Sequence, residues 1–351
     1  MTASPKPRVL HVDNREAFLQ SMDRTYQWKY ETLDRQHGIR CVDVRTEIKE
    51  TEAREFDILL VGICGLPLHP RYPPEGRLPT AVLKIIPKRC VVFEDMREWT
   101  FDGGIDVVCE QINRLYHYVI ATYECAELDR IRRSCPAIRK FFVLPHYINT
   151  QVYRDYGQPK IRDVVLFGNT KVHKYPFRNR LGRLLLNSNL NVEVVAHPGY
   201  EQFDTNKCGE GLALKINESR LAVATPSMSD YLVSKYYEIS ACRTVVTGTM
   251  PASGEAVWGD NYVALRTDMS DREILDRLSA ALADPEGLRR MADTMYEKIH
   301  RDYSLDAFVP AVNEILREIH ADTGPEGFRY DVTRELTDGR VDKKRHHRPS
   351  Q

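Results

Sequence analysis

The sequence lacks a net charge and any long apolar run. Its 351 residues include 50 Lys and Arg and 50 Asp and Glu, so the formal net charge is zero. A dedicated nucleic-acid-binding protein usually has a basic domain, so nucleic acid is a disfavoured partner. The longest apolar stretch, residues 58–66, is far too short to span a bilayer. Because 42% of the residues are apolar, we expect packed cores rather than disorder.

Common metal and catalytic motifs are also missing. The eight cysteines form no CxxC pair and no Cys/His cluster with zinc-ligand spacing, so we predict no metal site and expect reduced thiols. No GxGxxG follows a candidate strand, and Walker A, HExxH and GxSxG are absent, which argues against a dinucleotide cofactor. The N-terminal segment lacks the apolar core of a signal peptide. We therefore expect a cytoplasmic protein without a resident cofactor.

What the sequence does contain is a series of short β-branched apolar runs between amphipathic stretches, a pattern typical of buried parallel strands alternating with helices. Predicted strands span residues 8–12, 41–44, 57–62, 90–93, 118–122, 141–144, 163–167, 192–196, 221–224, 244–247 and 262–265. Predicted helices include residues 15–38, 177–186, 232–242, 271–283, 285–303 and 305–320. At roughly 150 residues per domain, the length favours two domains. We predict an α/β fold with two Rossmann-like domains facing a cleft.

The join between the domains is expected where residues 153–160 interrupt the apolar pattern. This places a first domain at 1–155 and a second at 156–304, followed by a helix at 305–320. The remaining residues, 321–351, form a polar and basic tail that we expect to be mobile. Its basic run, residues 343–348, could bind a polyanion or place the protein at an anionic membrane surface, although charged termini are commonly just solvated.

A glycine and several cations follow the predicted strand at 163–167. Glycine at the carboxyl end of a strand lets backbone amides approach a ligand, and a helix N-terminus with nearby cations favours a diphosphate. The residues concerned are Gly168, Lys171, Lys174, Arg178 and Arg180. A solvated basic loop before a helix would look the same, so this segment alone leaves both interpretations open.

Asp230, Lys235 and Glu238 lie in a predicted loop and helix between two strands. A carboxylate on such a helix can accept hydrogen bonds from two ribose hydroxyls, and a neighbouring ammonium can counter phosphate charge. Taken alone, Lys235 and Glu238 would more simply be a surface pair at i,i+3.

The wider context makes this segment more specific. Residues 235–246, KYYEISACRTVV, resemble the K-x-x-E-A-x-A-C-G-x-P-V segment of GT-B glycosyltransferases, notably family 4-like and CgeB-like group 1 enzymes. Residues 144–153 resemble their interdomain linker, and residues 168–178 resemble the start of their donor domain. Residues 280–292 and 303–308 are similar to their C-terminal ending. The matches follow in the family's order over the last two thirds of the chain.

The resemblance implies transfer of a sugar from a nucleoside diphosphate sugar to an acceptor hydroxyl, with retention and without a metal. The first domain would be the acceptor side, the second would bind the donor, and helix 305–320 would cross back to the first domain. Glu238 would hold the ribose, Lys235 and the basic residues after Gly168 would face the diphosphate, and Asp230 would contact the sugar. Asp230 stands where the family has glutamate, and Arg243 replaces a helix-ending glycine, which predicts a different turn there.

Four further residues are candidates from their positions after predicted strands. His197 precedes a Pro-Gly turn that could present it to the donor, although turn formation alone explains the pair. Met228 and Ser229 could offer backbone amides to the donor. Asp95 is the candidate general base for the acceptor hydroxyl, with a helix cap or a salt-bridged loop acid as the other interpretation.

Two alternative functions remain compatible with the sequence. One is a catalytically silent GT-B module that binds a nucleotide sugar or a partner protein, which the substitutions at Asp230 and Arg243 keep open. The other is a GT-B sugar epimerase. The sequence leaves the donor base and sugar open, and the acceptor could be a glycan, a small molecule or a protein.

Overall fold

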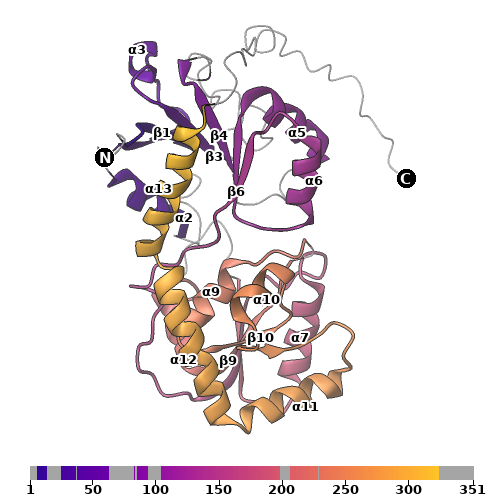
Figure 1. The fold of residues 1–351 in the computed structure, drawn as a ribbon. Helices are drawn as coiled ribbons and strands as arrows, with labels where there is room; N and C mark the ends of the chain where they lie inside the picture. Colours follow the sequence, from indigo (N-terminus) through magenta and orange to yellow (C-terminus); the bar gives the residue numbers. More distant parts are fainter. Residues whose placement is uncertain are drawn as a thin grey trace.

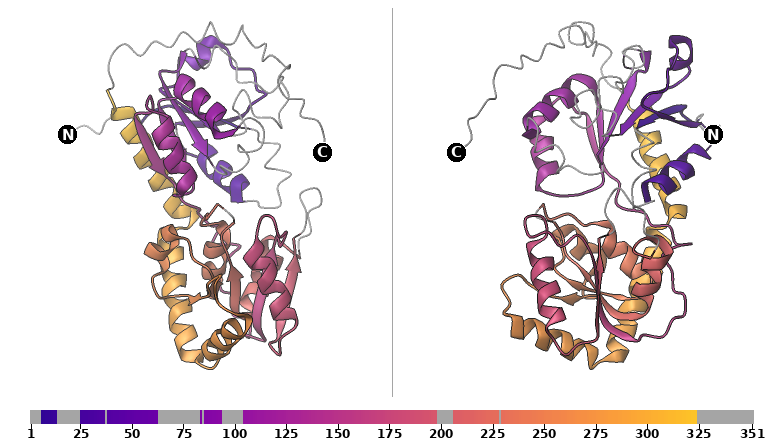
Figure 2. Two further views of the ribbon diagram at one scale, coloured as in Figure 1. Left: turned by 90° about the vertical axis from the view of Figure 1, so that its right-hand side faces the viewer. Right: turned by 180° about the vertical axis from the view of Figure 1, so that it is seen from behind.

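The computed structural model describes residues 6–13, 25–36, 38–62, 83, 85–93, 104–197, 206–227 and 229–323. They form two parallel β-sheets with helices on their faces, one above the other (Figures 1 and 2). All eleven predicted strands are present, and the predicted α/β fold class is confirmed. Buried Val, Ile and Leu run continuously along the central strands, as expected for sheets covered on both faces.

The first sheet has the order β2-β1-β3-β4-β5-β6, and every neighbouring pair is parallel. Its strands are β1 (Val9–Asp13), β2 (Ile39–Asp43), β3 (Ile58–Gly62), β4 (Lys88–Phe93), β5 (Tyr118–Ala121) and β6 (Lys140–Val143). The helices described here are α2 (Thr25–Asp34), α3 (Glu50–Ala53), α5 (Gly104–Leu115) and α6 (Ala126–Ser134). Helices α5 and α6 cover one face of the sheet, while α2 lies on the other (Figure 1).

The second sheet has the order β11-β10-β9-β7-β8 and is also parallel throughout. Its strands are β7 (Arg162–Gly168), β8 (Val192–Ala196), β9 (Ser219–Ala224), β10 (Val245–Gly248) and β11 (Val263–Ala264). Its helices are α7 (Pro176–Leu186), α8 (Gly209–Asn217), α9 (Ser234–Ala241), α10 (Ala252–Trp258), α11 (Asp271–Leu282) and α12 (Pro285–Asp302). Helices α8 and α10 were not predicted, because both are short and contain glycine, which weakens the helical signal.

The last helix, α13 (Leu305–Ala321), returns to the first domain (Figure 1). Its apolar face lies in the same core cluster as β1, β3 and β5. Its carboxyl end is held at the amino ends of the first sheet's strands, where the Lys88 ammonium donates to the backbone carbonyls of Ile319 (2.9 Å) and His320. Lys140 also pairs with Glu318 at 2.6 Å. The first domain is therefore completed by the end of the described chain.

Candidate functional site

The carboxyl ends of both sheets face one another. Strands β8, β7, β9 and β10 are adjacent and parallel, so the residues that follow them lie along one edge of the second sheet. Tyr231, in the segment after β9, stacks on Tyr123, which follows β5 of the first sheet, with ring centroids 4.4 Å apart and an interplanar angle of 8°. Tyr231 is fully buried and belongs to the first domain's core cluster. This is the edge where open α/β sheets bind ligands.

Gly168 ends β7 and makes room for Lys235 of α9. Its φ of +90° lies in the region that favours glycine. A Cβ added there would lie 2.6 Å from both Cε and Nζ of Lys235, so the lysine side chain passes directly over the glycine. The Lys235 ammonium lies 4.2 Å from the ring centroid of Phe167. The absence of a side chain at Gly168 thus sets the position of this cation.

Four cations gather around His197, which follows β8. Partial burial lowers the pKa of His197, and the neighbouring positive charges lower it further. These cations are Lys235, Lys171, Arg178 and Lys174. Lys171 and Lys174 are exposed, in the loop between β7 and α7. The structure therefore brings together the glycine, the histidine and the cations that the sequence marked separately.

Arg178 is 1% exposed and joins the loops after β7 and β9. Its guanidinium donates to the backbone carbonyl of Asn169 at 3.2 Å and to the carbonyl of Thr225 at 2.6 Å. Its Nε also donates to the Thr225 hydroxyl at 3.2 Å, and its guanidinium carbon lies 4.1 Å from the Tyr175 ring centroid. In this arrangement Arg178 fixes the two loops, and direct contact with a ligand stays a prediction.

Glu238 is 4% exposed, one turn after Lys235 on α9. Burial raises the pKa of the Cys242 thiol, and the nearby charge of Glu238 raises it further. A hydrogen bond to the segment after β10 also positions α9, because the Tyr236 hydroxyl donates to the carbonyl of Thr249 at 2.5 Å.

The amino ends of α7 and α9, like those of α8 and α10, have no side-chain hydrogen bond at the cap. Ser270, Asp284 and Ser304 cap α11, α12 and α13. Uncapped amino ends leave N–H groups available to an anion.

Asp230 faces acids from both domains. It is exposed and has a φ of 54°, and its N–H donates to the carbonyl of Ser227 at 3.1 Å. Loss of surrounding water raises the pKa of Asp230, and the charges of Glu127 and Glu255 raise it further. Glu127 lies in the first turn of α6, and its buried Oε2 has no hydrogen-bond partner among the described residues. The sequence analysis did not identify Glu127, because its proximity to Asp230 arises only when the domains meet.

The remaining candidates are less well defined. Ser229 is half-buried, and its N–H donates to the Ser227 hydroxyl at 3.3 Å. Asp95, Met228 and residues 198–200 lie outside the described residues, as does the tail from 324 onward.

His146, in the segment joining the domains, contacts residues of both domains next to α9. It is 3% exposed, and its Nε2 lies 2.9 Å from the Tyr123 hydroxyl. Its ring also meets Tyr237 of α9 edge-on, with centroids 6.1 Å apart. Burial lowers the pKa of His146 well below its usual range, and the positive charge of Lys29 adds to this. The histidine thus links α9 to the first domain as a neutral group.

Arg243 corrects one expectation from the sequence. It keeps the left-handed turn of a helix-ending glycine, with a φ of 52°. Its side chain pairs with Asp155 at 3.0 Å and with Asp293 at 2.7 Å. These two ion pairs connect the turn at Arg243 to the start of the second domain and to α12.

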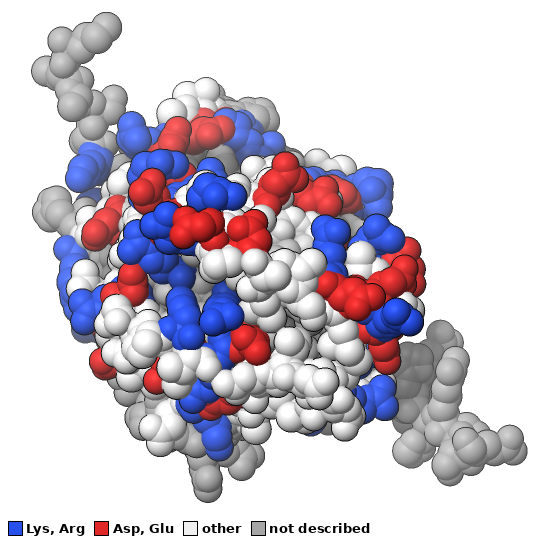
Figure 3. All heavy atoms as spheres, turned by 90° about the horizontal axis from the view of Figure 1, so that it is seen from below, with Lys and Arg blue, Asp and Glu red and all other residues white. Residues whose placement is uncertain are grey.

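Arg243 also lines a 390 Å³ hollow on the face of the second domain opposite the candidate site, together with Lys160, Arg220 and Arg289. Basic and acidic side chains are intermixed on this face (Figure 3). Each of the three arginines pairs with at least one carboxylate, so the hollow carries little unbalanced charge.

The described residues contain neither a metal-binding cluster nor a membrane-spanning helix. No group of three or more His, Cys, Asp or Glu side chains is arranged to hold a metal ion in this part of the chain. Among the helices described, none has the length and apolarity required to cross a membrane.

Comparisons with known proteins gave only structural matches. No family model and no curated protein matches the sequence. Sucrose-phosphate synthase from Thermosynechococcus elongatus superposes with a TM-score of 0.58 at 12% identity, covering 89% of this chain and 99% of the other. HepE from Anabaena, in complex with UDP and glucose, gives 0.56 at 12% identity over 89% and 100% of the two chains. T4 phage BGT, in complex with UDP-glucose, gives 0.51 at 12% identity over 89% and 99%. These likenesses show that the chain has the GT-B fold.

Proposed function

We propose that this protein is a glycosyltransferase that moves a sugar from a UDP-sugar to an acceptor hydroxyl. The observation that supports this most directly is the group of four cations around His197, at the carboxyl edge of the second sheet. A diphosphate is the ligand whose charge such a group would balance. Two proteins of the same fold, HepE and T4 phage BGT, have structures in complex with UDP or UDP-glucose, which supports uracil as the donor base.

In this proposal α9 and the loop before it hold the donor. The Glu238 carboxylate accepts hydrogen bonds from the ribose hydroxyls. The Lys235 ammonium, fixed over Gly168, balances the diphosphate with Lys171 and Lys174. Asp230 contacts the donor sugar, and Ser229 and the uncapped end of α9 offer N–H groups to the phosphates.

The proposed reaction proceeds with retention and without a bound metal. The bond from the anomeric carbon to the diphosphate breaks, its electron pair stays on the phosphate oxygen, and a bond to the acceptor oxygen forms. With retention the acceptor approaches the face from which the diphosphate leaves, so a leaving phosphate oxygen is close enough to take the acceptor's proton. The cations stabilise the negative charge that develops on that group. Asp95, which lies outside the described residues, is the alternative acceptor of that same proton.

The test combines UDP binding with a donor screen. Glu238→Gln and Lys235→Met should each weaken UDP binding by roughly 10- to 150-fold, the value of a hydrogen bond to a charged group. Glu286→Gln, an exposed acid on α12, and Lys298→Met, also on α12, are matched controls and should bind UDP as the wild type does. UDP-, GDP- and ADP-sugars are then screened for hydrolysis or transfer in EDTA, with the product anomer assigned by NMR.

Three results would contradict the proposal. Unchanged UDP affinity in both site variants would overturn the donor site. Tight UDP binding with no turnover of any donor would instead indicate a nucleotide-sugar-binding module. A strict requirement for added Mn²⁺ or Mg²⁺, or an inverted product, would refute the corresponding part of the mechanism.

A further inference from the structure

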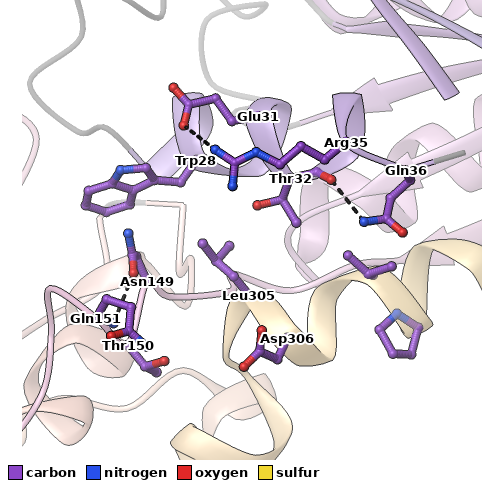
Figure 4. Close-up of a pocket in the computed structure, with 12 residues that line it drawn as sticks. Trp28, Glu31, Thr32, Arg35, Gln36, Asn149, Thr150, Gln151, Leu305 and Asp306 are labelled. Carbon is purple, nitrogen blue, oxygen red and sulfur yellow. Dashed lines mark hydrogen bonds and ion pairs between the residues drawn. The ribbon is translucent and has the colours of Figure 1, made fainter.

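A pocket of 660 Å³ lies away from the candidate donor site, where the two domains join. None of the residues assigned to the donor lines it. Helix α2 of the first domain forms one wall, and residues 149–151 together with the start of α13 form the other (Figure 4). This volume is typical of small-molecule sites.

The base of the pocket is built from the two segments that connect the domains. The Ile148 N–H donates to the Tyr303 carbonyl at 2.7 Å, and the Leu305 N–H donates to the Ile148 carbonyl at 3.1 Å. The two segments therefore run side by side as a short parallel bridge. The polar residues beside them, Asn149 to Gln151 and Asp306, are held on a defined backbone.

The aromatic wall is Trp28 of α2. Its indole is half-buried and packs against the core cluster of the second domain, although the helix belongs to the first. Figure 4 shows the ring at one end of the pocket, across from Asn149 and Gln151. An indole held in this way offers a flat apolar surface at little conformational cost.

The other lining groups are hydrogen-bonding and close to neutral as a set. Three amides, two threonine hydroxyls, two carboxylates and one guanidinium line the pocket, from Gln36, Asn149, Gln151, Thr32, Thr150, Glu31, Asp306 and Arg35. Their formal charge is −1, counting two acids and one base. Arg35 is already paired with Glu31 at 3.7 Å. An anionic ligand such as a phosphate therefore gains little here.

Several of these groups are open to a ligand. Within the described residues, the side chains of Thr150, Gln151 and Asp306 form no hydrogen bond. The Asn149 Oδ1 accepts from the Gln151 N–H at 3.0 Å, which leaves its NH₂ group available. Amides and carboxylates of this kind bind vicinal hydroxyl groups through paired donors and acceptors.

A flat indole beside neutral amides and carboxylates matches one chemical class. Pyranose rings present an apolar C–H face to an aromatic ring and hydroxyl groups at their rim. We propose that this pocket binds a neutral oligosaccharide, as a second saccharide site separate from the donor site. Its occupant would touch α2 and both connecting segments, and so would also restrain movement between the domains.

The test uses the full chain and two neutral probes, the β-1,4-linked trisaccharides of glucose and of N-acetylglucosamine. Binding is measured by saturation-transfer NMR and calorimetry, with a glucuronic-acid-containing oligosaccharide as the anionic comparison. We expect at least one neutral probe to bind and the anionic one to bind more weakly. Gln151→Ala and Trp28→Ala should each weaken that binding about tenfold, the loss of one well-formed contact.

The controls separate this proposal from folding and from the donor site. Gln158→Ala, an exposed glutamine in the same linker region, should bind the probe as the wild type does. Because Trp28 also packs against the core, the exposed Gln151 provides the variant that cannot fail by unfolding. Glu238→Gln should keep saccharide binding even though it weakens UDP binding. Failure of both neutral probes to bind, or equal binding by wild type, Gln151→Ala and Trp28→Ala, would overturn the proposal.

Discussion

Replacing Gly168 by alanine tests whether the glycine sets the position of the Lys235 ammonium. The added Cβ meets Cε and Nζ of Lys235 at 2.6 Å, so the side chain has to move away. A φ of +90° lowers the free energy of unfolding of the alanine variant by about 1–2 kcal/mol. Separately, loss of one charged contact to the diphosphate weakens binding by about 1.5–3 kcal/mol, or roughly 10- to 150-fold in UDP affinity.

A second glycine separates these two effects. Gly259 also has a positive φ, 52°, but a Cβ there meets nothing within 4 Å. Gly259→Ala should therefore lower the melting temperature by a few degrees, as Gly168→Ala does, and leave UDP binding intact. Thermal unfolding and calorimetric titration with UDP measure the two effects on each variant. If Gly168→Ala binds UDP within about twofold of Gly259→Ala, the reasoning about Lys235 is refuted.

Three other predictions concern charge and backbone. Burial and four neighbouring cations lower the pKa of His197, and a bound diphosphate offsets the cations. UDP-glucose binding should therefore strengthen as pH falls below about 6.5; His197→Asn should remove this dependence in calorimetry, and a wild type without it would count against the site. Burial and two neighbouring arginines lower the pKa of His117 to about 4, so the unfolded chain binds more protons between pH 6.5 and 4. The free energy of unfolding should fall as pH falls through that window, and His117→Gln should flatten the fall in urea titrations. Arg243→Gly and Arg243→Ala both lose two ion pairs, but only glycine tolerates a φ of 52°. The alanine variant should therefore be less stable than the glycine variant by about 1 kcal/mol in urea titrations. Equal stability of the two variants would argue against backbone strain at this position.

The strands could be predicted because burial on both faces makes them continuous apolar runs. Val9 to Val12 and Ile58 to Val61 are each at most 6% exposed, and no solvent-facing residue interrupts their pattern. Helices α8 and α10 have no such signal, because Gly209, Gly211 and Gly254 disfavour helix on propensity alone. Packing in the second domain stabilises them instead, and packing cannot be deduced from a short segment.

The candidate site was predictable only where its residues follow neighbouring strands. Gly168 and His197 come together because β7 and β8 are adjacent, a relation that the alternating pattern implies. Glu127 and Tyr231 come from different domains, so their place beside Asp230 and Tyr123 depends on how the domains dock. Nothing near either residue in the sequence marks that contact.

The return of α13 to the first domain also affects how the chain folds during synthesis. Phe308, Val312 and Ile319 complete the core around β1, β3 and β5, yet they lie about 170 residues after the first sheet's last strand, which ends at Val143. At about 5–20 residues per second, the ribosome needs roughly 10–35 seconds to make that stretch. The first domain therefore emerges with an apolar face uncovered while the second is still being made. Its stable folding waits until α13 has been made, and a chain that stops before α13 leaves that face open to chaperones and proteases.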